Sequence, residues 1–357
     1  MHRSRTAVYV FTPQGLALAK RLAGELPLTV FVPDALAARA EGARPFSKLD
    51  GLLAETFRRY DCHIFIAACG IAVRAVAPLL RGKASDPAVL VMDQRGRHVI
   101  SLLSGHLGGA NAMAERVAAT IGATPVITTA TDVEGLPAID ALASARGLAI
   151  GNLEAVKSVS AALLRGETVT LDDPRDLLGL ADGPWRPLFA RAPESDKTAH
   201  IIVTERAPES GPHAALYLHP RVLACGVGCK KNTPAEAVLE AIRAMLADSG
   251  YAPQSLACIA SIDAKRDEPG LAEAARKLGL PFRVFAPHEL AAHPPRTPSP
   301  KALERFGVVG VCESAALAAA SLGGATARLL VPKRVSPGVT VALASGHSPA
   351  DFRDESE

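Results

Sequence analysis

The chain of 357 residues has few aromatic residues, no long apolar run and almost no excess of charge. No apolar stretch approaches the ~20 residues of a membrane-spanning helix. The first residues enter a short strand-like run without the apolar core of a secretory signal peptide. Lys and Arg number 39 against 36 Asp and Glu, a balance that demands neither a nucleic acid nor an anionic membrane as partner. We therefore expect a cytoplasmic protein that binds neither.

Motifs for metals and nucleotides are also missing. The six cysteines lack the paired C-x-x-C spacing of a zinc site, and neither G-x-x-x-x-G-K-[ST] nor G-x-G-x-x-G occurs. Cys225 and Cys229 are close enough in sequence to hold a metal together, although free buried thiols are the commoner use of such cysteines. The sequence thus favours neither a disulfide framework nor a resident metal or nucleotide.

What is present is the pattern of a layered α/β protein. Short Val/Ile-rich runs alternate with longer Ala/Leu/Arg segments of helical spacing. A composition of 48% apolar but only 4% aromatic residues suits sheets covered by helices. We expect wound, mostly parallel sheets in an N-terminal α/β domain (1–139) and a C-terminal α/β domain (220–345), a smaller middle α/β domain (140–219) and a polar tail (346–357).

The expected elements have the following bounds. In the N-terminal domain the strands are Thr6–Thr12, Leu28–Val32, His63–Ala68, Ala88–Met92, His98–Leu103 and Pro125–Thr129, and the helices are Gln14–Gly24, Gly51–Tyr60, Val73–Leu80 and Ala110–Ile121. In the C-terminal domain the strands are Val222–Ala224, Leu256–Ile262, Arg283–Phe285, Val308–Val311, Arg328–Val331 and Val339–Ala344, and the helices are Pro234–Ala247, Leu271–Leu278 and one from Ser314.

Ligands of open α/β sheets bind at the carboxyl ends of the strands, so the loops that follow strands are the candidate sites. In the loop 67–74, Gly70 closes a strand and Arg74 falls in the first turn of the next helix. The alternative is an ordinary glycine turn with a surface arginine.

The stretch 104-SGHLGGAN-111 places a histidine among glycines between an apolar strand and a helix. Gly105, Gly108 and Gly109 let the backbone approach a ligand, and Asn111 can cap the following helix, whose N–H groups attract anions. His106 follows the end of a strand, where an imidazole can act as a general base. The alternative is a turn histidine without chemistry.

Two further loops carry polar groups just after strands. In 128-TTATD-132 the hydroxyl groups and Asp132 either contact a ligand or form an N-cap or Asx turn. In 224-ACGVGCKKNTPAEAV-238, Gly226 and Gly228 follow a strand, Lys230 and Lys231 come next, and 233–236 reads as a capping box with proline at the first helical position. This corner suits an anion, more readily a carboxylate than a nucleotide phosphate; the alternative is a well-capped helix with solvated lysines.

Three other features of the C-terminal domain are weaker. Asp263 with Lys265, and Glu313 with Ser314, again come just after expected strands, and gain weight because all would line one edge of the same sheet. The run 287–300, rich in Pro and His, is either a lid or binding loop or a plain surface excursion.

Several long motifs occur in a fixed order along the chain. They are GIAVRAVAPLL (70–80), DPAVLVMDQRGRHVISLLSGHLGGAN (86–111), PVITTATD (125–132), ACGVGCKKNTPAEAV (224–238), SIDAKRDEPGL (261–271), VVGVCESAAL (308–317) and LLVPKRVSPGVTVALA (329–344). Through them the chain resembles the cobalt-precorrin-5A hydrolase family (CbiG-type) of anaerobic cobalamin biosynthesis over most of its length. The middle region, about 140–219, has no motif that matches residue by residue.

The resemblance implies a substrate and a reaction. The substrate would be a cobalt-containing, ring-contracted tetrapyrrole with many carboxylate side chains and a δ-lactone. The family opens the lactone with water and releases acetaldehyde, giving cobalt-precorrin-5B. The cobalt belongs to the substrate, so no protein cofactor is expected. Residue chemistry, and not the resemblance, suggests the roles: His106 would be the base, with Glu313 or Asp132 as second acid–base or histidine-orienting group, and the N–H groups of 105–109 would stabilise the oxyanion.

The substrate-binding residues expected from the candidate loops are Gly70, Arg74, Ser104, Gly105, Gly108, Gly109, Asn111, Thr128, Thr129, Gly226, Gly228, Lys230, Lys231, Asn232, Thr233, Asp263, Lys265 and Ser314. The rival hypothesis is a non-catalytic corrinoid carrier, because GVGCKKNTPAEA also resembles a stand-alone protein of the oxygen-dependent pathway. The intact SGHLGGAN and TTATD favour the hydrolase. A nucleotide-dependent enzyme is disfavoured by the absent phosphate motifs. The oligomeric state stays open, with a homodimer as the assembly to test.

Overall fold

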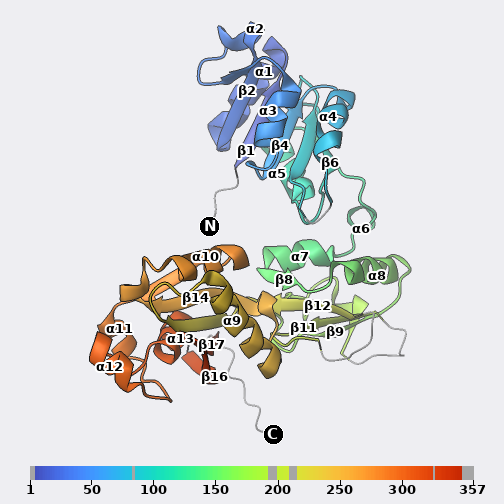
Figure 1. The fold of residues 1–357 in the computed structure, drawn as a ribbon. Coiled ribbons are helices and arrows are strands. Elements are labelled where there is room, and N and C mark those ends of the chain that lie inside the picture. Colours follow the sequence, from blue (N-terminus) through green and yellow to red (C-terminus); the bar gives the residue numbers. More distant parts are fainter. Residues whose placement is uncertain (1–4, 83–84, 192–198, 209–214, 325, 348–357) are drawn as a thin grey trace. The chain divides into compact units, whose positions relative to one another are not determined.

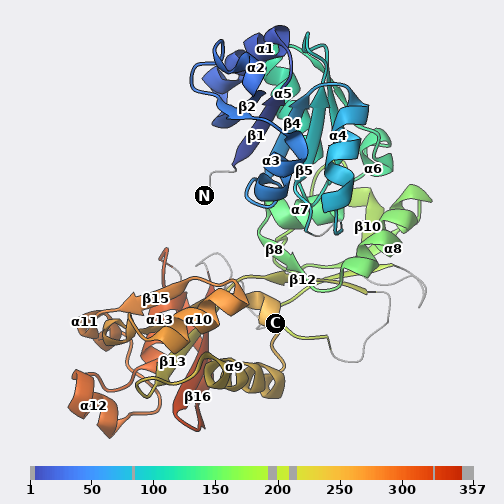
Figure 2. The same ribbon diagram turned by 45° about the horizontal axis from the view of Figure 1, so that its top comes forward.

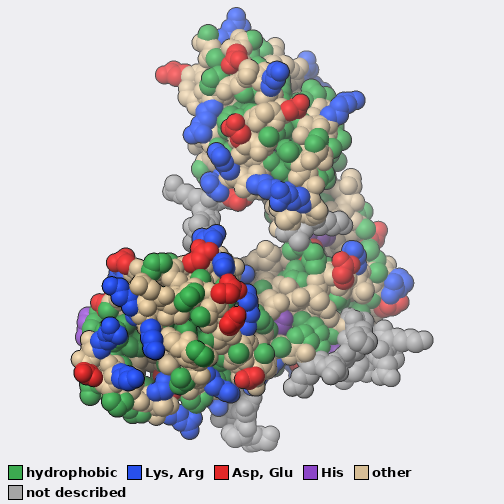
Figure 3. Space-filling model, in the orientation of Figure 1, with side chains coloured by type: hydrophobic (Ala, Val, Ile, Leu, Met, Phe, Trp, Pro, Cys, Tyr) green, Lys and Arg blue, Asp and Glu red, His purple; other side chains and the backbone are tan. Residues whose placement is uncertain are grey.

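The computed structural model describes residues 5–82, 85–191, 199–208, 215–324 and 326–347. The chain forms two compact units, Met1–Ser144 and Ala145–Glu357. Most of the expected polar tail lies outside the described residues. Within these ranges, none of the helices combines the length and apolar character needed to cross a membrane. On the face drawn in Figure 3, basic and acidic side chains of the described residues are interspersed.

The first unit is built on a sheet with the order β3-β2-β1-β4-β5-β6-β7 (Figures 1 and 2). Helices α1 and α5 cover one face of this sheet, and α3 and α4 cover the other. The strands are β1 (Thr6–Val10), β2 (Leu28–Pro33), β3 (Arg44–Phe46), β4 (Cys62–Ile66), β5 (Ala88–Met92), β6 (His98–Leu103) and β7 (Thr124–Val126). The helices are α1 (Pro13–Glu25), α2 (Asp34–Ala37), α3 (Leu49–Thr56), α4 (Cys69–Val76), η1 (Ala77–Leu79), α5 (Ala110–Ile121), α6 (Ala130–Val133) and α7 (Ile139–Ala145).

A tight hairpin reverses the direction of the chain between β5 and β6. The carboxylate of Asp93 accepts hydrogen bonds from the backbone N–H groups of Arg95, Arg97 and His98, and Gly96 takes the left-handed conformation (φ +66°) that the turn requires. Strand β6 therefore runs antiparallel to β5, whereas β5 is parallel to β4. The carboxyl end of β6 therefore lies beside the amino ends of β4 and β5, and their carboxyl ends lie at the other end of the strands.

The second unit contains two sheets, with the orders β10-β9-β11-β12-β8 and β15-β14-β13-β17-β16. In the second of these sheets, α9 and α10 pack on one face and α13 on the other. The strands are β8 (Leu148–Ile150), β9 (Val169–Asp172), β10 (Phe189–Ala190), β11 (His200–Val203), β12 (Ala215–Pro220), β13 (Leu223–Cys229), β14 (Leu256–Ile262), β15 (Phe282–Phe285), β16 (Thr326–Ser336) and β17 (Val339–His347). The helices are α8 (Leu153–Leu164), η2 (Arg186–Leu188), α9 (Ala235–Ser249), η3 (Pro253–Ser255), η4 (Asp263–Lys265), α10 (Pro269–Leu278), α11 (Pro287–Ala291), α12 (Pro300–Phe306) and α13 (Cys312–Ala320).

The wound, mostly parallel α/β architecture expected from the sequence is confirmed. The bounds of β5, β6, β14 and α5 agree with expectation to the residue. Two expectations about helix ends are wrong. Gly70 does not close a strand, because α4 already begins at Cys69. No capping box precedes α9, because Pro234 is its N-cap residue and the Thr233 hydroxyl donates to the carbonyl of Lys230 instead.

The segment 308–311 is not a strand. Its backbone runs irregularly between α12 and α13, where Val308 is buried and Val309 is 48% exposed. An apolar run of this length packs equally well as a connection between helices, so its composition alone does not specify a strand.

Gly226 and Gly228 lie inside β13 rather than after it. A Cβ atom at Gly226 would stand 1.8 Å from the carbonyl oxygen of Cys312 in α13. The glycine therefore lets helix α13 rest directly on the sheet. From composition alone, Gly226 was expected in a loop. The physical reason for a glycine here is the close packing of helix α13 on strand β13.

Substituting Gly226→Ala should lower the free energy of unfolding by about 3 kcal/mol or more, because backbone atoms cannot move away as a flexible side chain could. Gly24→Ala is the control, since no atom comes within 4 Å of its added Cβ; it should change stability by about 1 kcal/mol at most, in the stabilising direction. Urea unfolding of both variants measures this. Equal stabilities would contradict the packing assigned to α13.

Candidate functional site

The loop that follows β6 is a compact turn held by its own backbone. The N–H groups of Ala110 and Asn111 donate to the carbonyls of Ser104 and Gly105. Ser104 and Gly109 take positive φ values of 60° and 79°. A Cβ at Gly108 would lie 2.4 Å from the Cβ of Ser104, so this glycine allows the loop to close on itself. The loop therefore has one fixed shape, from which the side chain of His106 projects.

His106 lies between two carboxylates of the first unit. Its Nε2 is 2.7 Å from Oδ2 of Asp132 in α6, and its Nδ1 is 3.2 Å from Oδ1 of Asp140 in α7. The imidazole is 18% exposed, and the carboxylate of Asp132 is more exposed than that of Asp140 (31% against 13%). The sequence indicated His106 and Asp132 but missed Asp140, which is thirty-four residues beyond the histidine in an ordinary helix start.

These partners change the protonation of the histidine. The hydrogen bond to Asp140, together with that to Asp132, outweighs burial and raises the pKa of His106 to about 9. At neutral pH the ring is therefore an imidazolium that donates both N–H groups. The ring therefore holds its proton at neutral pH, whereas a general base requires the neutral imidazole.

Asn111 does not cap α5 but connects the loop to α6. It lies inside the helix, whose N-cap residue is Gly109. Its Nδ2 donates to Thr129 Oγ1 (2.8 Å) and to Asp132 Oδ2 (3.2 Å), and its Oδ1 accepts from the hydroxyl of Ser101 (2.7 Å). Asn111 thus orients the Asp132 carboxylate that faces His106. The stretches 104–111 and 128–132 therefore form one hydrogen-bonded site, which neither stretch indicates alone.

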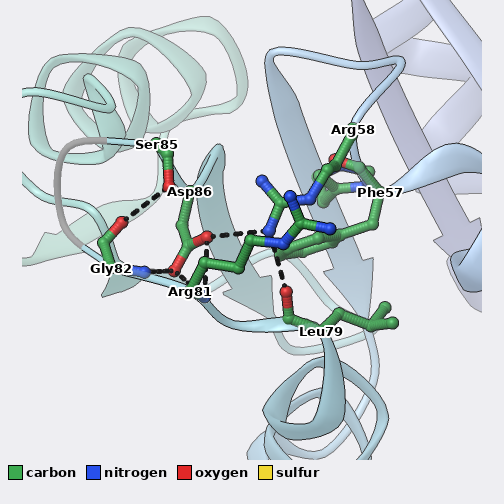
Figure 4. A network of polar contacts seen from close by, with 8 residues as sticks. Phe57, Arg58, Leu79, Arg81, Gly82, Ser85 and Asp86 are labelled. Atoms are coloured by element: carbon green, nitrogen blue, oxygen red, sulfur yellow. Dashed lines mark hydrogen bonds and ion pairs between the residues drawn. The ribbon is translucent and has the colours of Figure 1, made fainter.

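A second polar network borders the His106 loop on the amino-terminal side of β5 (Figure 4). Asp86 accepts hydrogen bonds from the N–H groups of Arg81 and Gly82 and from the guanidinium of Arg58, whose second partner is the carbonyl of Leu79. A Cβ at Gly108 would lie 3.2 Å from the carbonyl oxygen of Asp86, so the two loops touch. Arg58, which lies outside the quoted motifs, and Asp86, the first residue of the motif 86–111, therefore brace one side of the candidate site.

Gly70 and Arg74 lie at the opposite end of the strands of the same sheet from His106. Both follow β4, whose carboxyl end is opposite to that of β6, and a five-residue strand separates the two edges by roughly 15–20 Å. The guanidinium of Arg74 donates to the carbonyl of Gly70 (3.1 Å). The structure therefore does not bring these two residues to His106, because the hairpin at Asp93 reversed β6.

In the second unit, Glu313 is engaged by backbone groups. It is 1% exposed, its Oε2 accepts from the N–H of Thr297 (2.8 Å) and its Oε1 from the N–H of Lys333 (2.7 Å). Burial opposes its ionisation, but these N–H donors keep the pKa of Glu313 below its usual range. The geometry gives Glu313 a structural task, namely to tie the loop before α12 and strand β16 to the start of α13.

The loop 230–233 packs against the segment 263–270. Glu268 accepts from the N–H of Asn232 (2.6 Å) and from Nζ of Lys265 (2.9 Å), and both charged groups are buried. Lys265 is therefore neutralised within the protein, whereas Lys230 and Lys231 are exposed.

The remaining expected site residues are placed as follows. Ser314 is buried in α13, Thr233 is buried below Lys230, Asp263 is half-buried in η4, Thr128 is exposed before α6, and Gly228 lies in β13 beside the hydroxyl of Thr340. Asp263 and Lys265 directly follow the carboxyl end of β14, but Lys265, Glu313 and Ser314 are buried, so the four side chains are not displayed together at the surface.

Comparison with known proteins identifies related chains. Residues 51–132, 137–220 and 223–344 match the family models described as cobalamin synthesis G N-terminal, cobalamin biosynthesis central region and cobalamin synthesis G C-terminus. A cobalt-precorrin-5A hydrolase of Salmonella typhimurium is 39% identical over 96% of this chain and 97% of its own length. One of Priestia megaterium is 35% identical over 82% and 80%. The protein CobE of Sinorhizobium sp is 38% identical over 37% of this chain and 84% of its own length.

The raised pKa of His106 can be measured directly. The ring protons of His106 should titrate near pH 9 in NMR spectra assigned with the His106→Asn variant. Because the folded-state value lies above the unfolded value of 6.5, the ion pairs stabilise the protein fully below about pH 6.5, and this stabilisation disappears as pH rises through about 9.

His106→Asn should therefore lower the free energy of unfolding at pH 6 by up to about 3 kcal/mol, with a smaller loss at pH 9.5. His98→Asn is the matched control, since that imidazole is 58% exposed and 3.8 Å from its nearest carboxylate, Asp93; it should cost little at either pH. A His106 ring that titrates near 6.5 would contradict the two-carboxylate site.

Proposed function

The chain belongs to the cobalamin synthesis G family, and on this premise we propose that it is the enzyme that hydrolyses cobalt-precorrin-5A in cobalamin biosynthesis. The observation that carries the proposal is the His106 site: an imidazolium between two carboxylates, in a glycine loop within the N-terminal family match. Relatives named cobalt-precorrin-5A hydrolases cover nearly the whole chain, so the family assignment does not rest on one domain.

The reaction is the opening of the substrate's δ-lactone by water, followed by loss of acetaldehyde to give cobalt-precorrin-5B. The cobalt arrives and leaves in the macrocycle, so the protein supplies proton transfer and positioning but no metal of its own. We place the enzyme in the cytoplasm, where the other soluble intermediates of such a pathway would be available.

His106 and Asp132 can divide the proton transfers of lactone opening. The exposed carboxylate of Asp132 accepts a proton from the attacking water, and the imidazolium of His106 donates its proton to the departing ring oxygen. The 2.7 Å contact between Nε2 and Oδ2 then returns the proton from Asp132 to His106 and resets the site. In this proposal N–H groups of residues 105–108 stabilise the oxyanion of the tetrahedral intermediate, since the N–H of Gly109 already donates to the carbonyl of His106.

The same carboxylate can serve the second step. Asp132 takes the proton of the hydroxyl group that lactone opening exposes, the C–O bond becomes a carbonyl, and the adjacent C–C bond breaks. Its electron pair passes into the conjugated macrocycle, which serves as the electron sink. Asp140 does not face the substrate in this scheme; it is a positioning residue that holds Nδ1 of His106.

Acetaldehyde release from cobalt-precorrin-5A, coupled to alcohol dehydrogenase, tests this function. Wild type should release acetaldehyde, and His106→Asn should reduce the rate by about 10²–10⁴-fold, because it removes the proton donor. His98→Asn, the control on the neighbouring hairpin, should leave the rate unchanged. Turnover by His106→Asn at the wild-type rate would remove His106 from the chemistry, and pigment binding without release by wild type would favour the corrinoid carrier.

The pH profile of kcat/KM distinguishes an acid from a base. With His106 as the acid, kcat/KM should fall as pH rises through about 9. Asp140→Asn should move this alkaline limb to lower pH, because the bond to Asp140 is the largest contribution to the raised pKa. A rate that increases as pH rises through 9 would show that the neutral imidazole acts as a base.

A further inference from the structure

The second unit contains a cavity of about 380 Å³ at the carboxyl end of β13. Its walls come from the end of β13, the loop before α12, helix α12, the start of α13 and the β16–β17 hairpin. Part of the Pro-rich run 287–300 forms one wall, through Pro295, Thr297 and Ser299. This segment therefore encloses a space and is more than a surface excursion.

The cavity is strongly basic. Lys230, Lys301, Arg305 and Lys333 line it, and Glu313 is the one acidic residue among its lining groups. None of the four basic side chains belongs to an ion pair within the described part of the chain. Gathering cations without counter-charges costs free energy, so the arrangement indicates that an anion completes it.

Glu313 shapes the cavity without neutralising it. Its two oxygens accept from backbone N–H groups of Thr297 and Lys333, on two different walls. The ammonium of Lys333 makes only long contacts, 3.3 and 3.4 Å, with the carbonyls of Thr297 and Pro298. The carboxylate thus fixes the backbone that carries Lys333, while the lysine's charge stays available to a ligand.

Apolar side chains also line the cavity. Phe306 and Val339 line the cavity, and so does Val335, which is 74% exposed. The combination suits a ligand that has an apolar body with acidic groups around it. A nucleotide would instead call for a loop of backbone N–H groups around its phosphates, and no such motif is present in the sequence.

We propose that this cavity binds carboxylate side chains of a tetrapyrrole, with Lys301, Arg305 and Lys333 as the principal contacts and Val335 against the ring. The proposal rests on the proposed function and adds to it a binding site in the second unit, separate from the residues that transfer protons. It also assigns Glu313 the role of positioning Lys333, in place of acid–base chemistry.

Binding of uroporphyrin, an octacarboxylate tetrapyrrole, to the full chain tests the site by fluorescence titration. Lys301→Gln/Arg305→Gln should weaken binding about tenfold or more, because two charge-assisted contacts are removed. Arg276→Gln/Lys277→Gln is the matched control: it also removes one Arg and one Lys from a single helix of this unit, but their charges are paired with Glu273 and Glu236. The control should bind like wild type.

Competition separates carboxylates from phosphates. Benzenehexacarboxylate should displace uroporphyrin from wild type, whereas pyrophosphate at the same concentration should displace much less. Equal displacement by pyrophosphate would overturn the assignment of a carboxylate ligand.

Turnover distinguishes this proposal from the proposed function. With cobalt-precorrin-5A, Lys301→Gln/Arg305→Gln should raise KM and leave kcat close to wild type. If wild type releases acetaldehyde but the double variant has unchanged Kd and KM, the cavity proposal is wrong and the hydrolase stands. If uroporphyrin binds through the cavity and wild type releases no acetaldehyde, the cavity stands and the hydrolase fails.

Discussion

The contact of one imidazolium with two carboxylates is the interaction on which the N-terminal site depends. Asp132 and Asp140 come from two short helices that follow β7, and His106 comes from the turn after β6. Without the positive ring between them, two like charges would face each other across a partly buried space. The same contacts that hold these segments together also keep the proton on the histidine. The protonation of His106 therefore affects both the stability of this site and its capacity for proton transfer.

The carboxylates of the two units illustrate how surroundings decide function. Glu313 and Glu268 are buried and occupied by N–H groups or a lysine of the protein, so they stabilise loops. Asp132 shares one oxygen with His106 and Asn111 and is 31% exposed, so it can meet a substrate. From sequence alone, Glu313 and Asp132 looked equivalent, because each is an acidic residue near the start of a helix that follows an apolar run. Their hydrogen-bond partners are distant in sequence or are backbone groups, so a sequence motif cannot identify these partners.

Much of the fold was accessible from local pattern. Strands such as β5 and β14 are short, apolar and bounded by polar residues, and α5 follows a glycine turn, so their bounds could be predicted to the residue. The errors occur where tertiary packing overrides composition. Gly226 reads as a loop residue but lies in a strand, where its missing side chain lets α13 rest on the sheet, and 308–311 reads as a strand but is an irregular connection between two helices.

The sequence by itself determined the α/β class and the family resemblance and indicated His106 as a candidate site residue, since these follow from periodicity and from residues that are adjacent in the chain. The tertiary structure decided which residues meet. It reversed β6 at Asp93, moved Gly70 and Arg74 to the far edge of the sheet, and brought Asp140 to the histidine. It also gathered Lys230, Lys301, Arg305 and Lys333 from three segments around one cavity. Such meetings depend on strand direction and on the packing of distant segments, which a linear pattern does not encode.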